Sequence, residues 1–362
     1  MRSLAPWCAS AWKAWTAEPP MAAVQHLVVP GLLGFPADVL PADGARLPHL
    51  ERVLTRSRCR PAPAGYAATL LQLAGVPAGA DDPTQPAADL PSAALRYLAD
   101  TGALPPGPVL QADPVYLQPD QDRLLLFDQP SRDLTDAQAA ALCAAFNDHF
   151  GADGFTLEAP TPGRWYLLPP RPPALQTTEL PIVLGRNIDL FLPRGPEAAA
   201  WRSLLNEVQM LFHAAPANAE REAAGQVPVS GIWLSGGGAL PTSLPAAPPP
   251  RWLGDTDALS RGLQQWRGQP QSGVAGAEGM VVELFLDALQ AIAAADPNAW
   301  LTALRSLDAR LAQRQRERGT WVLHRCDGQC HHWQRGDRWR WWRRPRPLSH
   351  WLRDAAEPAL PR

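Results

Sequence analysis

The sequence predicts an α/β protein whose sheet core is flanked by helices and interrupted by an α+β insertion. Two apolar runs end directly in glycine-containing loops, VQHLVVPGLLGF (24–35) and SGIWLSGGG (230–238). Helical segments alternate with these runs, whereas pairs of short strands crowd the middle of the chain. We therefore expect a core that the chain leaves and later rejoins.

These patterns place the predicted boundaries. Residues 22–109 and 229–352 form the discontinuous core, and residues 110–228 form the inserted α+β domain. Residues 1–21 are expected to be a loose tail or a mis-called start, because Met21 precedes the first convincing strand.

The first core segment contains three predicted helices, at 47–57, 66–76 and 92–102. The first carries leucine and valine on one face, and the last ends at Gly102, a typical helix stop. In the insertion, strand pairs are predicted within 115–127 and 155–169.

Further along, Thr135 is expected to cap an alanine-rich helix over 134–150, and 201–215 has the pattern of an amphipathic helix. After a Pro/Ala/Gly-rich surface excursion (241–280), the sequence predicts helices at 280–295 and 297–318. An apolar strand at 320–325 then precedes a basic tail.

Composition excludes several classes of protein. The 362 residues are 46% hydrophobic, which is enough for a sizeable core, and the formal charge of -2 gives no global field to recruit nucleic acid or an anionic membrane. No apolar run approaches the ~18 residues of a membrane span. Five scattered cysteines indicate reduced thiols, so we expect a cytoplasmic protein.

Glycines 236–238 follow an apolar strand, so their N–H groups could cradle a phosphate. They match neither a P-loop nor GxGxxG. The alternative is a tight turn where the backbone passes close to a neighbour.

Three arginines lie beside turn-forming residues, in PTPGRW, LGRNID and NAERE. Arginine suits bidentate binding of carboxylate or phosphate, although any single one could be an ion-paired surface residue. The predicted anion-binding residues are Arg164, Arg186, Asn218, Arg221, Gly236, Gly237 and Gly238.

The segment HRCDGQCHHW (324–333) places four possible zinc ligands, Cys326, Cys330, His331 and His332, within seven residues. Their spacing is not that of two separated knuckles, and adjacent ligands rarely reach one ion. We favour a turn with incidental cysteine and histidine.

In the tail GDRWRWWRRPRPLSHW (336–351), arginines interleave with tryptophans. They could bind single-stranded nucleic acid by charge and stacking. Alternation over 338–341 favours instead a strand with tryptophan packed inward and arginine outward. We therefore expect neither nucleic acid nor membrane as a partner; a protein partner stays open.

In order, the chain carries LVVPGLLGF, LPHLERVL, PAGYAATLLQLAGVP, DLPSAALRYLADTG, ADPVYL, APTPGRWYL, GRNIDLFLP, LLNEVQMLFHAAPANAEREAAG, WLSGGG and RRPRPL. This series resembles the proteobacterial family named for the regulatory protein RpfE, often labelled phosphoglycerate mutase. It is more distantly similar to the archaeal-type cofactor-independent phosphoglycerate mutases of the alkaline phosphatase superfamily. The resemblance implies an alkaline phosphatase-like sheet core.

Such mutases use two metal ions held by aspartates and histidines, a serine that carries the phosphoryl group, and arginines that grip the substrate. Here Pro30-Gly31 stands at the place of the metal-binding Asp-Gly, and Gly65-Tyr66-Ala67 at that of the Gly-Ser-Asp segment. Asp287, Asp296 and the group His324–His332 lie near the later metal motifs without their spacing. Arg164 corresponds to a substrate-side His-Arg element, and Asn218, Arg221 and Gly225 to a similar turn.

The resemblance therefore implies a degenerate protein, with no cofactor, that binds a small phosphorylated or carboxylated metabolite as a regulatory or ligand-sensing module. An active mutase or phosphatase with non-standard ligands is the alternative, using Asp38, Asp43 or the Cys/His segment. Nucleic-acid binding by the tail is a third hypothesis.

Overall fold

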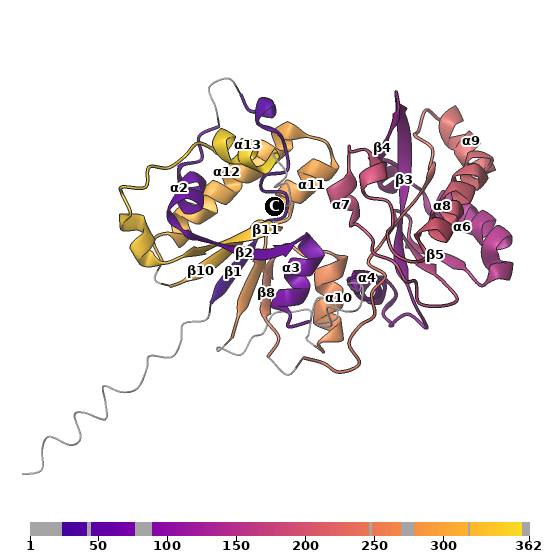
Figure 1. Ribbon diagram of the computed structural model, residues 1–362, viewed down its shortest axis with the longest axis horizontal. Coiled ribbons are helices and arrows are strands. Elements are labelled where there is room, and N and C mark those ends of the chain that lie inside the picture. Colours follow the sequence, from indigo (N-terminus) through magenta and orange to yellow (C-terminus); the bar gives the residue numbers. More distant parts are fainter. Residues whose placement is uncertain are drawn as a thin grey trace, which may run out of the picture.

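Two lobes make up the protein in the computed structural model, which describes residues 24–41, 45–76, 89–245, 248–268, 279–317 and 319–356 (Figure 1). The core lobe contains a mixed sheet of six strands, and the second lobe contains an antiparallel sheet of five. The predicted α/β class, a helix-flanked core with a second sheet, is confirmed. The expected loose segment 1–21 lies outside the described residues.

The core sheet has a parallel centre and antiparallel strands at one edge. Its order is β2 (Arg58–Ala64), β11 (Asp327–Trp333), β10 (Trp321–His324), β1 (Gln25–Val28), β9 (Val281–Leu284) and β8 (Arg251–Gly254). Strands β10, β1, β9 and β8 run parallel, whereas β11 and β2 are antiparallel.

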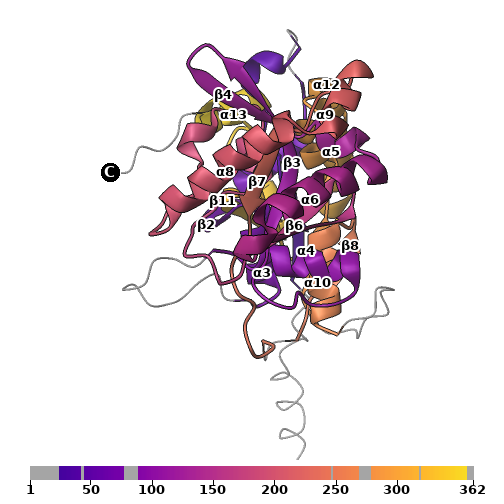
Figure 2. The same cartoon turned by 90° about the vertical axis from the view of Figure 1, so that its right-hand side faces the viewer.

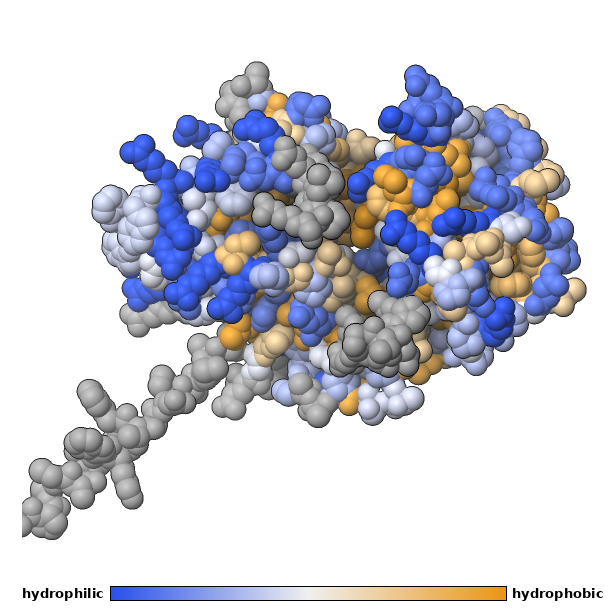
Figure 3. All heavy atoms as spheres, viewed as in Figure 1, coloured by the Kyte–Doolittle hydropathy of each residue, from blue (hydrophilic) through white to orange (hydrophobic). Residues whose placement is uncertain are grey.

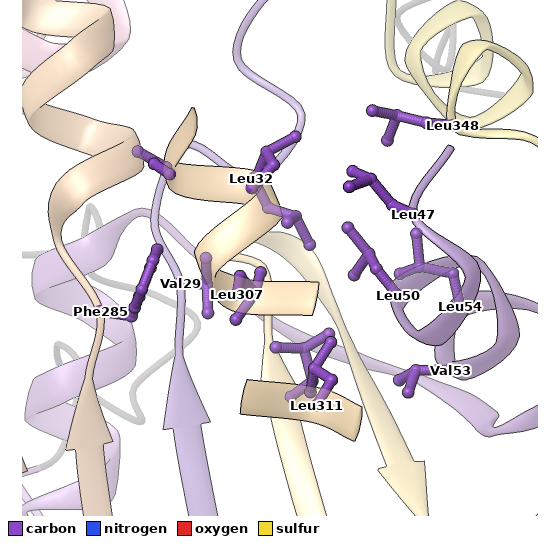
Figure 4. Packing of buried hydrophobic residues seen from close by; sticks show 14 of the residues in the cluster. Val29, Leu32, Leu47, Leu50, Val53, Leu54, Phe285, Leu307, Leu311 and Leu348 are labelled. Carbon is purple, nitrogen blue, oxygen red and sulfur yellow. The ribbon is translucent and has the colours of Figure 1, made fainter. Parts of the chain in front are cut away.

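Helices cover both faces of this sheet. On one face α2 (Pro48–Arg56), α11 (Asp287–Ala293), α12 (Pro297–Arg314) and α13 (Leu348–Ala356) form a large apolar cluster with the sheet. Figure 4 shows this packing, in which Leu50 and Val53 of α2 face Leu311 of α12. On the other face α3 (Tyr66–Leu73) and α10 (Ala258–Trp266) pack against Val28, Val282 and Leu284. The 3-10 turn η1 (Ala37–Val39) lies in the loop after β1.

In the second lobe, β3 (Leu110–Asp120) pairs with β4 (Arg123–Phe127), β6 (Arg164–Leu168) and β7 (Gly231–Ser235), and β5 (Thr156–Thr161) pairs with β6. Helices α6 (Asp136–Phe150) and α8 (Ala198–His213) cover its outer face (Figure 2), and α9 (Pro216–Ala223) continues from α8. Helix α4 (Ser92–Thr101) belongs to the core lobe, where it packs on α10, and its other side contacts the second sheet. Helix α7 (Leu180–Val183) packs on the same side of that sheet. Short turns α5 (Pro130–Asp133), η2 (Gly151–Asp153) and η3 (Ile188–Leu190) complete the lobe.

Local signals fix several element ends as the sequence predicts. Thr135 and Gln138 form a reciprocal capping box at the start of α6. Gly102 ends α4 in the left-handed conformation, at φ 81°, which a residue with a side chain rarely adopts. The two predicted strand pairs are present as β3–β4 and β5–β6.

Four predictions are wrong, and three of the errors come from pairing between strands that are distant in the chain. Residues 281–284 form a strand and not a helix, because they pair on both edges, with β1 and β8. The expected turn around Cys330 is strand β11. Strand β7, assigned to the core segment from residue 229, pairs instead with β3.

The fourth error concerns the tail. Residues 335–339 form the 3-10 turn η4 (Arg335–Trp339) and not a strand, and Trp339, Trp341 and Trp342 are 65%, 76% and 64% exposed. No helix in the described ranges is long and apolar enough to cross a membrane. The four described cysteines are all free thiols.

Candidate functional site

The carboxyl ends of the parallel strands β1, β9 and β10 meet at one edge of the core sheet, which is where open α/β sheets bind ligands. Tyr66 begins α3 at this edge, and the N–H of the preceding Gly65 donates to the carbonyl oxygen of Cys326 at 2.9 Å. The Tyr66 hydroxyl donates to Oδ1 of Asp257 at 3.0 Å. Burial raises the pKa of Tyr66 well above its usual value, so the phenol stays protonated.

A buried polar network joins the two lobes beside Tyr66. Arg96 of α4 donates to Oε1 of Gln111 at 2.8 Å and lies 3.5 Å from Oε1 of Glu179. The other oxygen of Glu179 accepts the N–H of Ala67, in the first turn of α3, at 3.3 Å. The second lobe thus places its own carboxylate at the helix end where an anionic ligand would otherwise bind.

Asp113 is the least satisfied member of this network. Its Oδ1 accepts from the Gln111 side chain at 2.6 Å, but Oδ2 has no hydrogen-bond partner among the described residues. Burial raises its pKa to about 6, and the residue is only 4% exposed. A carboxyl group with this pKa suits proton transfer near neutral pH, but Asp113 is buried too deeply for a substrate to reach it.

The donor set at this edge does not fit the two-metal centre implied by the mutase resemblance. Pro30 offers no side-chain ligand, and the Tyr66 hydroxyl is bonded to Asp257. Within the described ranges, no group of three or more histidine, cysteine, aspartate or glutamate side chains is arranged to hold an ion. Asp38 lies in η1, and Asp43 lies outside the described residues.

Three histidines share one face of the core sheet, a grouping that the sequence analysis missed. Nδ1 of His26 lies 2.9 Å from Nε2 of His324, and the two rings stack at 5.2 Å. Strand register brings His332 to the same face, 3.5 Å from Sγ of Cys330. Burial lowers the pKa of His26 to about 4 and that of His324 to about 3.

The neighbouring histidine on the strand points the other way. His331 is fully buried, and its Nδ1 lies 2.9 Å from the hydroxyl oxygen of Ser57. Because adjacent strand residues face opposite sides, His331 and His332 cannot share one ion. Cys326 lies at the α3 end of the strand, so the four proposed zinc ligands do not converge.

The three glycines form a close-packed turn whose N–H groups are already used. Gly236 donates to the Thr177 hydroxyl, Gly237 to Oδ2 of Asp89 and Gly238 to the carbonyl of Leu90, each at 3.1 Å. A Cβ atom on Gly238 would lie 1.8 Å from the Asp89 carbonyl oxygen. A carboxylate of the chain itself therefore takes the place of the expected ligand.

The predicted arginines also have intramolecular partners. Arg164 binds both carboxylate oxygens of Asp100 at 2.6 Å, and Asp100 also accepts from the Tyr166 hydroxyl. Arg221 is fully buried and pairs with Asp133 at 2.5 Å.

Arg221 also donates to the Gln138 side chain and the Val227 carbonyl. Asn218 forms three bonds to the backbone, one to Phe212 in α8 and two to Val229, which follows α9. Only Arg186 is exposed, with its guanidinium 4.7 Å from the Phe191 ring centre. The seven predicted residues thus serve separate structural contacts and do not form one site.

A pocket of about 530 Å³ is lined by parts of both connections between the lobes, among them Leu104 and Val109 after α4 and Gly237 and Leu240 after β7. We call it the connection pocket. Among the described residues that line it, one is charged, Asp89, and one is an amide, Gln176. The others are apolar or glycine: Ala94, Leu104, Pro105, Gly107, Pro108, Val109, Pro172, Pro173, Ala174, Leu175, Gly195, Pro196, Gly237, Gly238, Ala239 and Leu240. Sequence reasoning found its glycines but not the apolar walls, which come from four separate loops.

Comparison with known proteins gives similarity of structure alone. No family model matches the chain, and no curated protein matches it. The chain is similar to a cofactor-independent phosphoglycerate mutase from Thermoplasma acidophilum DSM 1728, at 13% identity and a TM-score of 0.37, over 87% of this chain and 90% of that one. It is also similar to the PH0037 protein from Pyrococcus horikoshii, at 12% identity and a TM-score of 0.41, over 86% and 87% of the two chains.

Proposed function

We propose that this protein is a regulatory, ligand-binding module that holds a small molecule in the connection pocket without turning it over. The observation that supports this proposal is that both connections between the lobes line one pocket. A ligand there contacts the segments that set the relative position of the lobes. Ligand binding can therefore change the relative position of the two lobes.

The lining narrows the ligand class. Proline, leucine, valine and alanine side chains offer mainly carbon surface, which suits a ligand with an apolar body. The Asp89 carboxylate is a poor neighbour for a second anion, and two of the three arginines expected to attract one, Arg164 and Arg221, bind carboxylates of the chain. We therefore favour an uncharged, largely apolar small molecule over the phosphorylated metabolite that the sequence suggested.

A pocket-filling variant tests binding. Nile red, a neutral apolar dye, is titrated into the wild type and into Ala239→Trp, in which an exposed alanine of the lining becomes bulky. We expect one saturable site in the wild type and at least about tenfold weaker binding in the variant, a loss of about 1.4 kcal/mol. Ala103→Trp, at an exposed alanine outside the lining, is the control and retains wild-type binding. Equal binding by both variants would contradict the pocket assignment.

Turnover is tested separately with 3-phosphoglycerate and p-nitrophenyl phosphate in the presence of Mg²⁺, Mn²⁺ or Zn²⁺. We expect no activity above the buffer rate. Activity that a chelator abolishes would favour the alternative, an active mutase or phosphatase with non-standard ligands.

A further inference from the structure

The segment 335–347, which we call the Arg/Trp segment, displays side chains that proteins seldom leave in water. It contains six arginines, three tryptophans and a single acidic residue, Asp337. The three tryptophans are about two-thirds exposed or more. In Figure 1 the segment runs along the left margin of the core lobe, between β11 and α13, and Figure 3 shows strongly hydrophilic side chains along this margin. Clustered exposed aromatic rings indicate an interaction surface.

The charge of this surface is largely uncompensated. Asp337 is buried and pairs with Arg340 at 3.1 Å. Arg335, Arg343 and Arg344 are exposed, and none forms an ion pair with a described residue. Two more exposed arginines, Arg58 and Arg60, lie on the neighbouring edge strand, because β2 pairs with the end of β11 that leads into the segment.

The segment is held in place and is not a frayed end. Arg56, at the end of α2, donates to the carbonyl oxygens of Arg338 at 2.8 Å and of Arg343 at 3.1 Å. Arg340 returns a bond to the carbonyl of Arg56 at 2.9 Å. The Arg346 N–H donates to the Thr55 hydroxyl at 3.0 Å. The exposed rings and guanidinium groups are therefore positioned before any partner arrives, which lowers the entropic cost of binding.

We propose that the Arg/Trp segment, together with Arg58 and Arg60, is a docking surface for single-stranded nucleic acid. Successive bases stack on the tryptophan rings while arginines contact the phosphates between them. Trp341 and Trp342 do not stack face to face on one another, so the two rings do not cover each other as a stacked pair would. Trp341 and Trp342 stand at 82° to each other with centroids 6.1 Å apart, and the Arg338 guanidinium lies 4.7 Å from the centre of the Trp339 ring.

The same composition could suit an anionic membrane, but the arrangement favours nucleic acid. Interfacial membrane segments separate a continuous apolar face from a charged face. Here arginine and tryptophan alternate over residues 338–341, and one more tryptophan and two arginines follow, so charge and rings are interspersed. Residues 335–347 include no leucine, isoleucine, valine, phenylalanine or methionine to enter the acyl region. Interspersed charges and rings can contact phosphates and bases along one strand.

Fluorescence anisotropy of labelled dT20 and U20 with the full chain tests the proposal, and the two oligonucleotides distinguish DNA from RNA. We expect binding that weakens about 50-fold between 50 and 200 mM salt if about four phosphates are contacted. Trp341→Ala/Trp342→Ala should weaken binding at least about fivefold at either salt concentration. Arg343→Gln/Arg344→Gln should weaken it and reduce the salt dependence.

The matched control is Met210→Ala/Arg123→Gln, which removes an exposed apolar side chain and an exposed arginine from the second lobe. It should bind like the wild type. All variants alter exposed side chains, and unchanged circular dichroism and melting temperature verify their folding. Absent binding, salt-independent binding, or equal loss in the control would overturn the proposal. So would binding to phosphatidylglycerol vesicles without binding to either oligonucleotide.

Discussion

The two lobes bury different basic side chains and avoid an unpaired buried charge in different ways: in one the side chains are neutral, and in the other they are paired with carboxylates. The core sheet buries His324 and His331, whose pKa values burial lowers to about 3, so that both stay uncharged. The second lobe encloses Arg164 and Arg221, whose guanidinium groups cannot lose a proton and are matched by Asp100 and Asp133. Arg325, a buried arginine of the core lobe, follows the same rule through Asp327.

This difference explains why the arginines were poor indicators of a ligand site. A buried guanidinium needs an anionic partner, and for Arg164, Arg221 and Arg325 a carboxylate of the same chain supplies it. A guanidinium that is free to bind a partner is therefore found on the surface, as in the Arg/Trp segment.

The largest expected difference between the lobes is in how acid changes their stability. Below about pH 6.5 the unfolded chain binds protons on His26, His324 and His331, while the folded pKa values of about 4, 3 and 3 keep these sites neutral. Stability is therefore full above pH 6.5 and falls as the pH drops toward 4, by up to about 1.4 kcal/mol per pH unit for each histidine.

Native-state hydrogen exchange of β1 and β10 amides between pH 7.5 and 5 measures this loss. The double variant His26→Asn/His324→Asn should show a shallower dependence. The prediction fails if the opening free energy of β1 and β10 does not change over this range.

Removing the buried charge of the second lobe should have the next largest effect. Arg221→Met removes the donor from the Asp133 carboxylate and the Val227 carbonyl, and one of two donors from the Gln138 side-chain oxygen. Because the Asp133 side chain is 39% exposed and water can hydrate it, we expect a loss of about 1–3 kcal/mol in the free energy of unfolding, measured in urea. A loss below 1 kcal/mol would show that water replaces the guanidinium readily.

The effect of Asp113 on stability should change with pH in the direction opposite to that of the histidines. Its folded pKa of about 6 lies above the ordinary value, so the folded state binds the extra proton, and this site destabilises the fold above pH 6. Asp113→Asn keeps the acceptor for Gln111 and removes the charge. We expect a gain of about 1–3 kcal/mol at pH 7.5 that disappears near pH 4. Urea unfolding at both pH values measures it, and destabilisation at pH 7.5 would contradict the assignment.

The smallest effect is expected at Arg186, the exposed arginine of the second lobe. Arg186→Met loses one backbone bond and its position beside the Phe191 ring. The change in unfolding free energy should stay within about 0.5 kcal/mol, as for most surface substitutions. A loss approaching that of Arg221→Met would mean that residue type, and not burial, sets the cost.

Much of the fold follows from local sequence because its determinants lie within a turn of one another. Thr135 and Gln138 fix the start of α6, and Gly102 fixes the end of α4. The strand pairs of the second lobe are joined by short turns, so their partners are also close in sequence. The predicted α/β core with an antiparallel insertion required little more than these signals.

The connection pocket and the histidine group on the core sheet required the tertiary structure, because their contacts join residues far apart in the chain. His26 and His324 are 298 positions apart, and neither has a sequence pattern that names the other. The same segment 281–284 that looks helical becomes a strand once β1 and β8 offer hydrogen bonds on both sides. Sequence thus determined which residues are arginine, tryptophan or glycine, and where local elements begin and end. Only the fold decided which of those side chains are already partnered and which face solvent.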